Sequence, residues 1–193
     1  MHPVSLAALN KIILASEPLS AGADRAVLGE GPESADIAFV GEQPGDQEER
    51  EGRPFVGPAG QLLDRGMEEA NIDRRKVYVT NAVKHFKFVQ RGKRRIHQKP
   101  NAGEVKRYRW WLFEELTFVQ PKLVVALGAT AALALTGKVV AIGKSRGETQ
   151  FGNFRGYITV HPSALLRLPD EAARHEAYAA FLADLKRIRA LAA

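Results

Sequence analysis

The residue best placed for nucleophilic chemistry is His97, which lies in an unusually cationic segment. This segment begins at Lys84 and carries seven Lys or Arg residues, with no carboxylate until Glu104. It ends in the run from Lys93 to Pro100, which Gly92 precedes, and this composition predicts a loop that presents positive charge to a polyanion. Neighbouring cations disfavour a second positive charge on the imidazole, so His97 should keep a free lone pair. It is therefore a candidate nucleophile, although a solvated basic loop with an idle histidine fits the segment alone equally well.

Polar side chains also follow three of the predicted strands. Four short apolar runs bounded by turn residues are typical of buried strands, namely residues 36–40, 77–80, 123–127 and 157–160. The polar clusters are Glu42 to Asp46, Asn81 with the basic segment, and His161 to Ser163. If the strands are parallel, all three clusters meet at one edge of the sheet, where open α/β sheets bind ligands.

An aromatic residue, Phe55, lies in a Gly- and Pro-rich stretch from Gly52 to Gly60. A rigid frame of this kind suits a flat platform on which a nucleobase stacks, although a core position is an alternative. Asn81, taken singly, is also typical of a loop cap. The combination of carboxylates, an amide, two histidines and an aromatic ring favours a site that reads and cuts at a nucleobase.

The elements that position these residues alternate between strands and helices. Helical patterns cover residues 4–16, the segment after Pro58, the segment opened by Asn101 and Glu104, the alanine-rich run before Gly137 and the segment after Asp170. The alternation predicts an α/β fold, a three-layer αβα single domain over residues 1–193 with a central, mostly parallel four-stranded sheet. Residues 138–156 are Gly-rich and could add an edge hairpin.

Composition narrows the class of protein further. The net charge of +6 favours an acidic partner such as nucleic acid. The absence of cysteine excludes disulfides, thiolate zinc sites and a cysteine-ligated iron–sulfur cluster, and no other metal-ligand spacing is present. With no long apolar stretch and no signal pattern, we expect a cytoplasmic monomer without a membrane partner.

Several motifs, in this order, resemble the uracil-DNA glycosylase superfamily near its family 4 members. They are Gly41-Glu42-Gln43-Pro44-Gly45-Asp46-Gln47-Glu48, Gly52 to Gly60, Thr80 to Phe86, Leu127-Gly128-Ala129 and His161-Pro162-Ser163. The run Lys93-Arg94-Arg95-Ile96-His97 is similar to the extra loop of the X-type branch (UdgX), which bonds covalently to DNA at a uracil site.

The resemblance implies a role in base excision repair and a uracil pocket. A uracil nucleotide would be taken from single-stranded DNA or flipped from a duplex, and free uracil would be a product. Phe55 would stack on the base, Asn81 would pair with its Watson–Crick edge and His161 would donate to its O2. Gln43, Gly45 and Asp46 would line the pocket or hold a water.

The same resemblance implies that His97 attacks the sugar C1′, with Glu42 orienting it and taking its proton. The residues expected to contact DNA are Lys84, Lys93, Arg94, Arg95, Ser163 and Arg167. Three other interpretations stay open: a glycosylase that turns over with water, a non-catalytic sensor of uracil or abasic sites, and a generic basic DNA-binding domain. In a prokaryote the protein would associate with the nucleoid.

The chain departs from the family at the iron–sulfur cluster, since the four cysteines that hold it in relatives are missing. One ligand position falls near Tyr108, and a pair falls near Leu14 and Glu17. We expect no cofactor, and we expect Tyr108, Leu14 and neighbouring apolar groups to fill the space as ordinary core.

Overall fold

The computed structural model describes residues 2–193, and its centre is a five-stranded sheet. In spatial order the strands are β2 (Tyr78–Asn81), β1 (Ile37–Gly41), β5 (Leu123–Leu127), β7 (Phe154–Thr159) and β6 (Gly147–Phe151). The first four are parallel and include the four predicted strands, while β6 is an antiparallel edge. The predicted α/β class is therefore confirmed, and the edge hairpin supplies the fifth strand.

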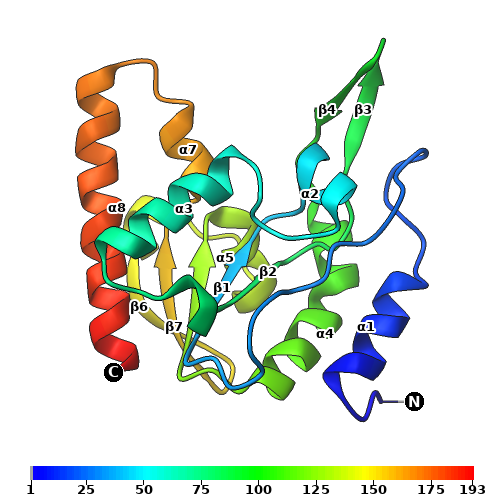
Figure 1. The fold of residues 1–193 in the computed structure, drawn as a ribbon, viewed down its shortest axis with the longest axis horizontal. Coiled ribbons are helices and arrows are strands. Elements are labelled where there is room, and N and C mark those ends of the chain that lie inside the picture. Colours follow the sequence, from blue (N-terminus) through cyan, green and yellow to red (C-terminus); the bar gives the residue numbers. More distant parts are fainter. Residues whose placement is uncertain (1) are drawn as a thin grey trace.

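Helices cover both faces of this sheet (Figure 1). One face packs against α1 (Leu6–Leu14), α4 (Ala102–Val119) and α5 (Ala129–Thr136). The other packs against α3 (Pro58–Glu69), α7 (Pro162–Leu166) and α8 (Glu171–Ala192). Shorter helices are α2 (Asp46–Glu51), α6 (Ile142–Ser145) and a 3-10 turn at Arg74–Lys76. Among the helices of residues 2–193, none has the length and apolar content needed to cross a bilayer.

The central strands are apolar because both of their faces are buried. In β1, Ala38 and Val40 point into the core beneath α4, whereas Ile37 and Phe39 point into the core beneath α3 and α8. Successive side chains of a strand alternate between the two faces, so a strand covered on both sides needs an unbroken apolar run. The polar residues that follow each run are thereby placed at the carboxyl edge of the sheet.

Local signals fix several helix ends as predicted. Asn101 accepts from the Glu104 backbone N–H at 2.9 Å, and the Glu104 carboxylate accepts from the Asn101 backbone N–H at 2.7 Å. This reciprocal pair starts α4. Pro58 occupies the first turn of α3, and Gly137 ends α5 in the left-handed conformation.

The basic segment is a β-hairpin, so the prediction of a loop was wrong. Strands β3 (Phe88–Arg91) and β4 (Arg94–His97) pair in register, with Phe88 opposite His97. Gly92, at a φ of 58°, supplies the tight turn. The hairpin projects beyond the sheet in Figure 1. Cross-strand pairing outweighs the weak strand preference of the charged residues.

Lys84 is the second correction, because it was predicted to contact DNA. Its side chain is fully buried, and its Nζ lies 2.5 Å from a carboxylate oxygen of Glu115 and 2.5 Å from the Thr80 hydroxyl. The same carboxylate accepts from Tyr78 at 2.8 Å. Because Lys84 is buried and paired in this way, its ammonium group cannot contact a DNA phosphate. Removing either partner would leave the other charge buried and unpaired in the core.

The region near Tyr108 contains a buried polar pair. The Tyr108 hydroxyl lies 2.7 Å from Nδ1 of His85, and Trp111 packs edge-on against the Tyr108 ring. Leu14 is 53% exposed, so the expectation that it fills this space is wrong. Burial of His85 lowers the pKa of its imidazole to about 4. Tyr108 and His85 together join α4 to the segment that follows β2.

This burial predicts a pH-dependent stability. Below its ordinary pKa of 6.5 unfolded His85 binds a proton, whereas the folded protein binds it only near about 4, so stability is lost as the pH falls through this window. Between pH 7 and pH 5 the loss is about 2 kcal/mol. His85→Asn, whose amide can still reach Tyr108, should reduce the loss in urea unfolding experiments. The exposed His175→Asn is the matched control, and equal slopes for both variants would contradict the prediction.

Candidate functional site

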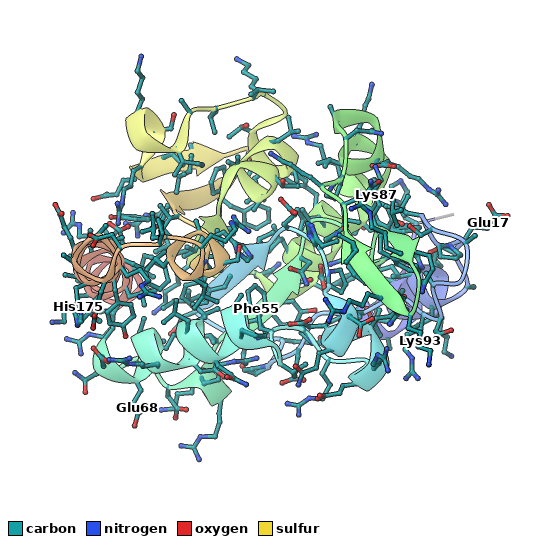
Figure 2. The ribbon with its side chains drawn as sticks, turned by 90° about the horizontal axis from the view of Figure 1, so that it is seen from above. Glu17, Phe55, Glu68, Lys87, Lys93 and His175 are labelled. Atoms are coloured by element: carbon teal, nitrogen blue, oxygen red, sulfur yellow. The ribbon has the colours of Figure 1, made fainter. Side chains whose placement is uncertain are left out.

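A cavity of about 740 Å³ lies at the carboxyl edge of the sheet. Figure 2 looks down on this region, with Phe55 near its centre. Nine of the residues selected from the sequence line the cavity: Glu42, Gln43, Gly45, Phe55, Asn81, His97, His161, Ser163 and Arg167. The polar ends of β1, β2 and β7 do therefore converge, as a parallel sheet requires.

Phe55 and Asn81 both lie close against Gly41. A side chain at Gly41 would place its Cβ 2.4 Å from Asn81 Oδ1 and 2.6 Å from Phe55 Cζ, so only glycine fits. Phe55 itself has a φ of 56°, which is costly for a bulky residue. Gly60 permits this turn, because a Cβ there would lie 1.8 Å from the Phe55 carbonyl oxygen. The ring is thus held in one place beside the amide.

His161 follows β7 and caps the short helix α7. Its Nδ1 accepts from the Ser163 backbone N–H at 3.2 Å and lies 2.8 Å from the Ser163 hydroxyl. A backbone N–H can only donate, so Nδ1 carries no proton and Nε2 carries it. Burial lowers the pKa of His161 to about 4. The side chain is therefore a neutral imidazole with an N–H donor at Nε2.

Glu42 connects the hairpin to the sheet. One of its carboxylate oxygens accepts from the Thr130 hydroxyl at 2.5 Å, and the other lies 3.2 Å from His97 Nε2. Burial alone would raise the pKa of Glu42, but the hydrogen bonds from His97 and Thr130 outweigh it and hold the pKa below its usual value. The carboxylate is therefore ionised at neutral pH. It can accept a proton from His97 or from a water beside it.

Gln43 holds the base of the hairpin instead of offering its amide to the cavity. Its amide nitrogen donates to the carbonyls of Lys87 and Gln98, both at 3.1 Å, and its oxygen accepts from the Lys87 N–H at 3.2 Å. These bonds join the two strands just outside the hairpin. Since Gln98 follows His97 directly, Gln43 fixes the place where His97 enters the cavity.

Arg95 fastens the opposite side of the hairpin to α2. Its guanidinium pairs with Asp46 and with the buried Glu49, and it covers the rings of Phe86 and Phe88 at 5.5 and 5.0 Å. Only 11% of its side chain is exposed. The structure thus corrects two expectations, because Arg95 is not free for DNA and Asp46 lies outside the cavity lining.

Lys93 and Arg94 are exposed at the hairpin tip, where cations can reach a phosphate.

Glu48, Lys99 and Thr130 belong to the site although the sequence did not single them out. Glu48 accepts from the backbone N–H groups of Gly45 at 3.0 Å and Gly57 at 2.9 Å. A glutamate three residues after the start of a helix is one half of a capping box, and this local pattern could have revealed Glu48 although Gly45 has no side chain to form the other half.

With no cysteine in the chain, the protein cannot hold an iron–sulfur cluster through cysteine ligands. At Tyr108 the structure has the hydrogen bond to His85 described above. Within residues 2–193, no three His, Asp or Glu side chains gather closely enough to share a metal ion.

This arrangement of fold and cavity agrees with the families that the chain matches. The model of the uracil DNA glycosylase superfamily matches residues 28–186, which include the sheet and all the cavity-lining residues discussed above. The chain therefore belongs to the uracil-DNA glycosylase superfamily.

Individual relatives within that superfamily include type-4 and type-5 enzymes. A type-4 uracil-DNA glycosylase of Thermotoga maritima is 38% identical over 153 residues, covering 78% of this chain and 76% of its own length. A type-4 uracil-DNA glycosylase of Pyrobaculum aerophilum is 34% identical over 161 residues, covering 79% of each chain. A type-5 uracil-DNA glycosylase of the same organism is 33% identical over 133 residues, covering 60% of this chain and 55% of its own.

Two arginines of the hairpin, Arg94 and Arg95, should respond differently to substitution. Arg94→Ala should weaken binding to single-stranded DNA by about three- to tenfold at low salt and reduce the salt dependence, because an exposed phosphate contact is lost. Arg95→Ala should instead expose the hairpin amides to hydrogen exchange, because the links to Asp46 and Glu49 are broken.

Anisotropy with a labelled oligonucleotide and exchange measured by mass spectrometry check both effects, and each variant is the control for the other. If the two variants matched in both measurements, the separation of roles would be wrong.

Proposed function

We propose that this protein excises uracil from DNA by cleaving the N-glycosidic bond. The observation that carries the proposal is the meeting of Phe55, Asn81 and His161 in one cavity beneath a cationic hairpin. An aromatic ring, a fixed amide and a neutral imidazole donor are the groups that stacking, recognition and departure of a uracil require. The family membership and the type-4 relatives support the same activity.

Asn81 supplies the specificity. Its NH₂ group can donate to uracil O4 while its oxygen accepts from N3–H. Cytosine presents a donor at position 4 and an acceptor at N3, so an amide held in one orientation rejects it. Asn81 is 4% exposed at the end of β2, and it pairs in register with Gly41, which favours a fixed orientation.

His161 assists departure of the base. When the bond between C1′ and N1 breaks, the electron pair leaves with uracil, and negative charge develops on O2. The Nε2–H of His161 can donate to this oxygen, an interaction of the oxyanion-hole type worth about 3 kcal/mol. A neutral donor keeps its proton, so uracil leaves as an anion and is protonated later by solvent.

Water is the first candidate to take the place of the base. It would form the new bond to C1′ and give its proton to Glu42, whose carboxylate is ionised and lines the cavity. The product would be an abasic site, and the enzyme would turn over. The type-4 glycosylases among the relatives favour this course.

Capture by His97 is the second candidate, favoured by one observation. His97 lies 3.2 Å from Glu42, so the carboxylate can take the proton that the imidazole loses when its nitrogen bonds to C1′. The result would be a covalent link between protein and DNA, as in the X-type branch that the hairpin sequence resembles. A half-exposed side chain at the rim of the cavity can reach a sugar outside it.

A denaturing gel separates these courses. The purified protein is incubated with a labelled single-stranded oligonucleotide that contains one uracil, with a thymine oligonucleotide as the control. Hydrolysis predicts free DNA that breaks under alkali, and capture predicts a slowly migrating band with uracil alone. Intact free DNA would contradict both courses and favour a non-catalytic sensor.

His97→Ser tests the role of the nucleophile directly. Any covalent band should disappear, because serine has no imidazole to form the bond. Alkali-labile sites should persist or increase, since the shorter side chain leaves room for water beside Glu42. A covalent band that survives in the variant would assign the attack to another residue.

Asn81→Asp tests recognition. A carboxylate cannot donate to O4 but can accept from the cytosine amino group, so the preference for uracil over cytosine should fall by about a hundredfold or more. The comparison is made from single-turnover rates on matched uracil and cytosine oligonucleotides. An unchanged preference would mean that Asn81 serves only as a strand cap.

A further inference from the structure

A second cavity of about 250 Å³ lies beside the first, between α3, α7 and α8. Leu166 lines both cavities and is 46% exposed, so the two spaces adjoin at this residue. The apolar part of the second cavity consists of Leu62, Leu165, Leu166 and Tyr178. An open apolar cavity next to a substrate pocket is suited to a further part of the same substrate.

Cationic side chains surround this apolar floor. Arg174 of α8 and Arg65 of α3 line the second cavity beside the ring of His175, and Arg167 lines the first. The ion pairs among residues 2–193 include neither Arg167 nor Arg174. These two guanidinium groups are therefore available to an anion.

Two carboxylates offset two of the three positive charges of Arg65, Arg167 and Arg174, so one net positive charge remains. Glu69 pairs with Arg65 at 2.8 Å, and Glu171 lines the cavity one helical turn before Arg174. The guanidinium of Arg65 lies over the Tyr178 ring at 5.0 Å, which leaves a flat cationic surface above the apolar floor. Bases of single strands stack on arginine planes as well as on aromatic rings.

The cavity and the hairpin lie on opposite sides of the uracil pocket. In Figure 2, Lys93 of the hairpin is on one side of Phe55 and His175 of α8 is on the other. Because Leu166 lines both cavities, a strand that crossed the pocket from the hairpin would continue over it into the second cavity. Charge at both ends of this path suits a single polyanion better than two separate ligands.

We propose that the cavity between α3, α7 and α8 is a second DNA subsite, which binds a nucleotide of the uracil-containing strand on one side of the lesion while the hairpin binds the other side. The inference rests on the proposed function and extends it to the length of strand that the protein reads. The flanking base would contact the leucines and the Arg65 plane, and its phosphate would pair with Arg174.

The experiment combines an arginine substitution with shortening of the DNA. Arg174→Ala and the control Arg189→Ala, an exposed arginine of the same helix outside both cavities, are compared with the unchanged protein. Binding is measured by anisotropy on thymine oligonucleotides, and the dependence of single-turnover excision on protein concentration is measured on the matching uracil oligonucleotides, in which the uracil fixes the position of both flanks. Each flank is shortened in turn from about six nucleotides to one.

Arg174→Ala should weaken binding to the long oligonucleotide by about three- to tenfold at low salt, and Arg189→Ala should not. On the uracil oligonucleotides, shortening one flank should remove the difference between Arg174→Ala and the unchanged protein. Shortening the other flank should remove the effect of Arg94→Ala instead. The first of these flanks would then contact α8, and the second would contact the hairpin.

The subsite would be refuted if Arg174→Ala matched Arg189→Ala on every oligonucleotide, or if its defect were the same after either flank was shortened. A failure of the proposed function looks different. In that case no uracil oligonucleotide would lose its base, whatever the outcome of the binding measurements on thymine DNA.

Discussion

The attachment of the hairpin to the body of the protein is the interaction on which the site depends. Gln43, the second residue after strand β1, holds both flanks of the hairpin through three hydrogen bonds, and Arg95 ties one face of the hairpin to α2. Without these links a two-stranded hairpin is at best marginally stable. With them, His97 is held beside Glu42 at the rim of the cavity.

The sheet imposes the remaining order on the site. Asn81 ends β2 and His161 follows β7. Side chains of each of these strands donate hydrogen bonds to one buried carboxylate on a helix that packs against the sheet. Glu115 accepts from Tyr78 and Thr80 of β2, and Asp184 accepts from Tyr157 and Thr159 of β7. Hydrogen bonds from alternate residues of a strand fix the position of that strand relative to the helix that packs against it. The amide and the imidazole are thus presented by rigid strands, as precise recognition requires.

The sequence predicts those features that depend on neighbouring residues. Asn101 with Glu104 marked the start of α4, and the apolar runs marked four strands, because capping and alternation act over a few positions. It failed for Lys84, whose partner Glu115 lies 31 residues away, and for Arg95, whose carboxylates lie more than 40 residues away. In the sequence, a Lys or Arg that pairs with a distant carboxylate of the same chain cannot be distinguished from one that is free to bind a phosphate. The same limit explains why Thr130 was missed, because its partner Glu42 lies 88 residues away.

Release of free uracil is the most direct test of the central claim. A uracil-containing oligonucleotide is incubated with the protein, and the small-molecule fraction is analysed by mass spectrometry beside a cytosine control. We expect uracil from the first oligonucleotide and no base from the second, whichever group bonds to C1′. Absence of uracil at stoichiometric protein would contradict the assignment of the Phe55, Asn81 and His161 cavity as a glycosylase site.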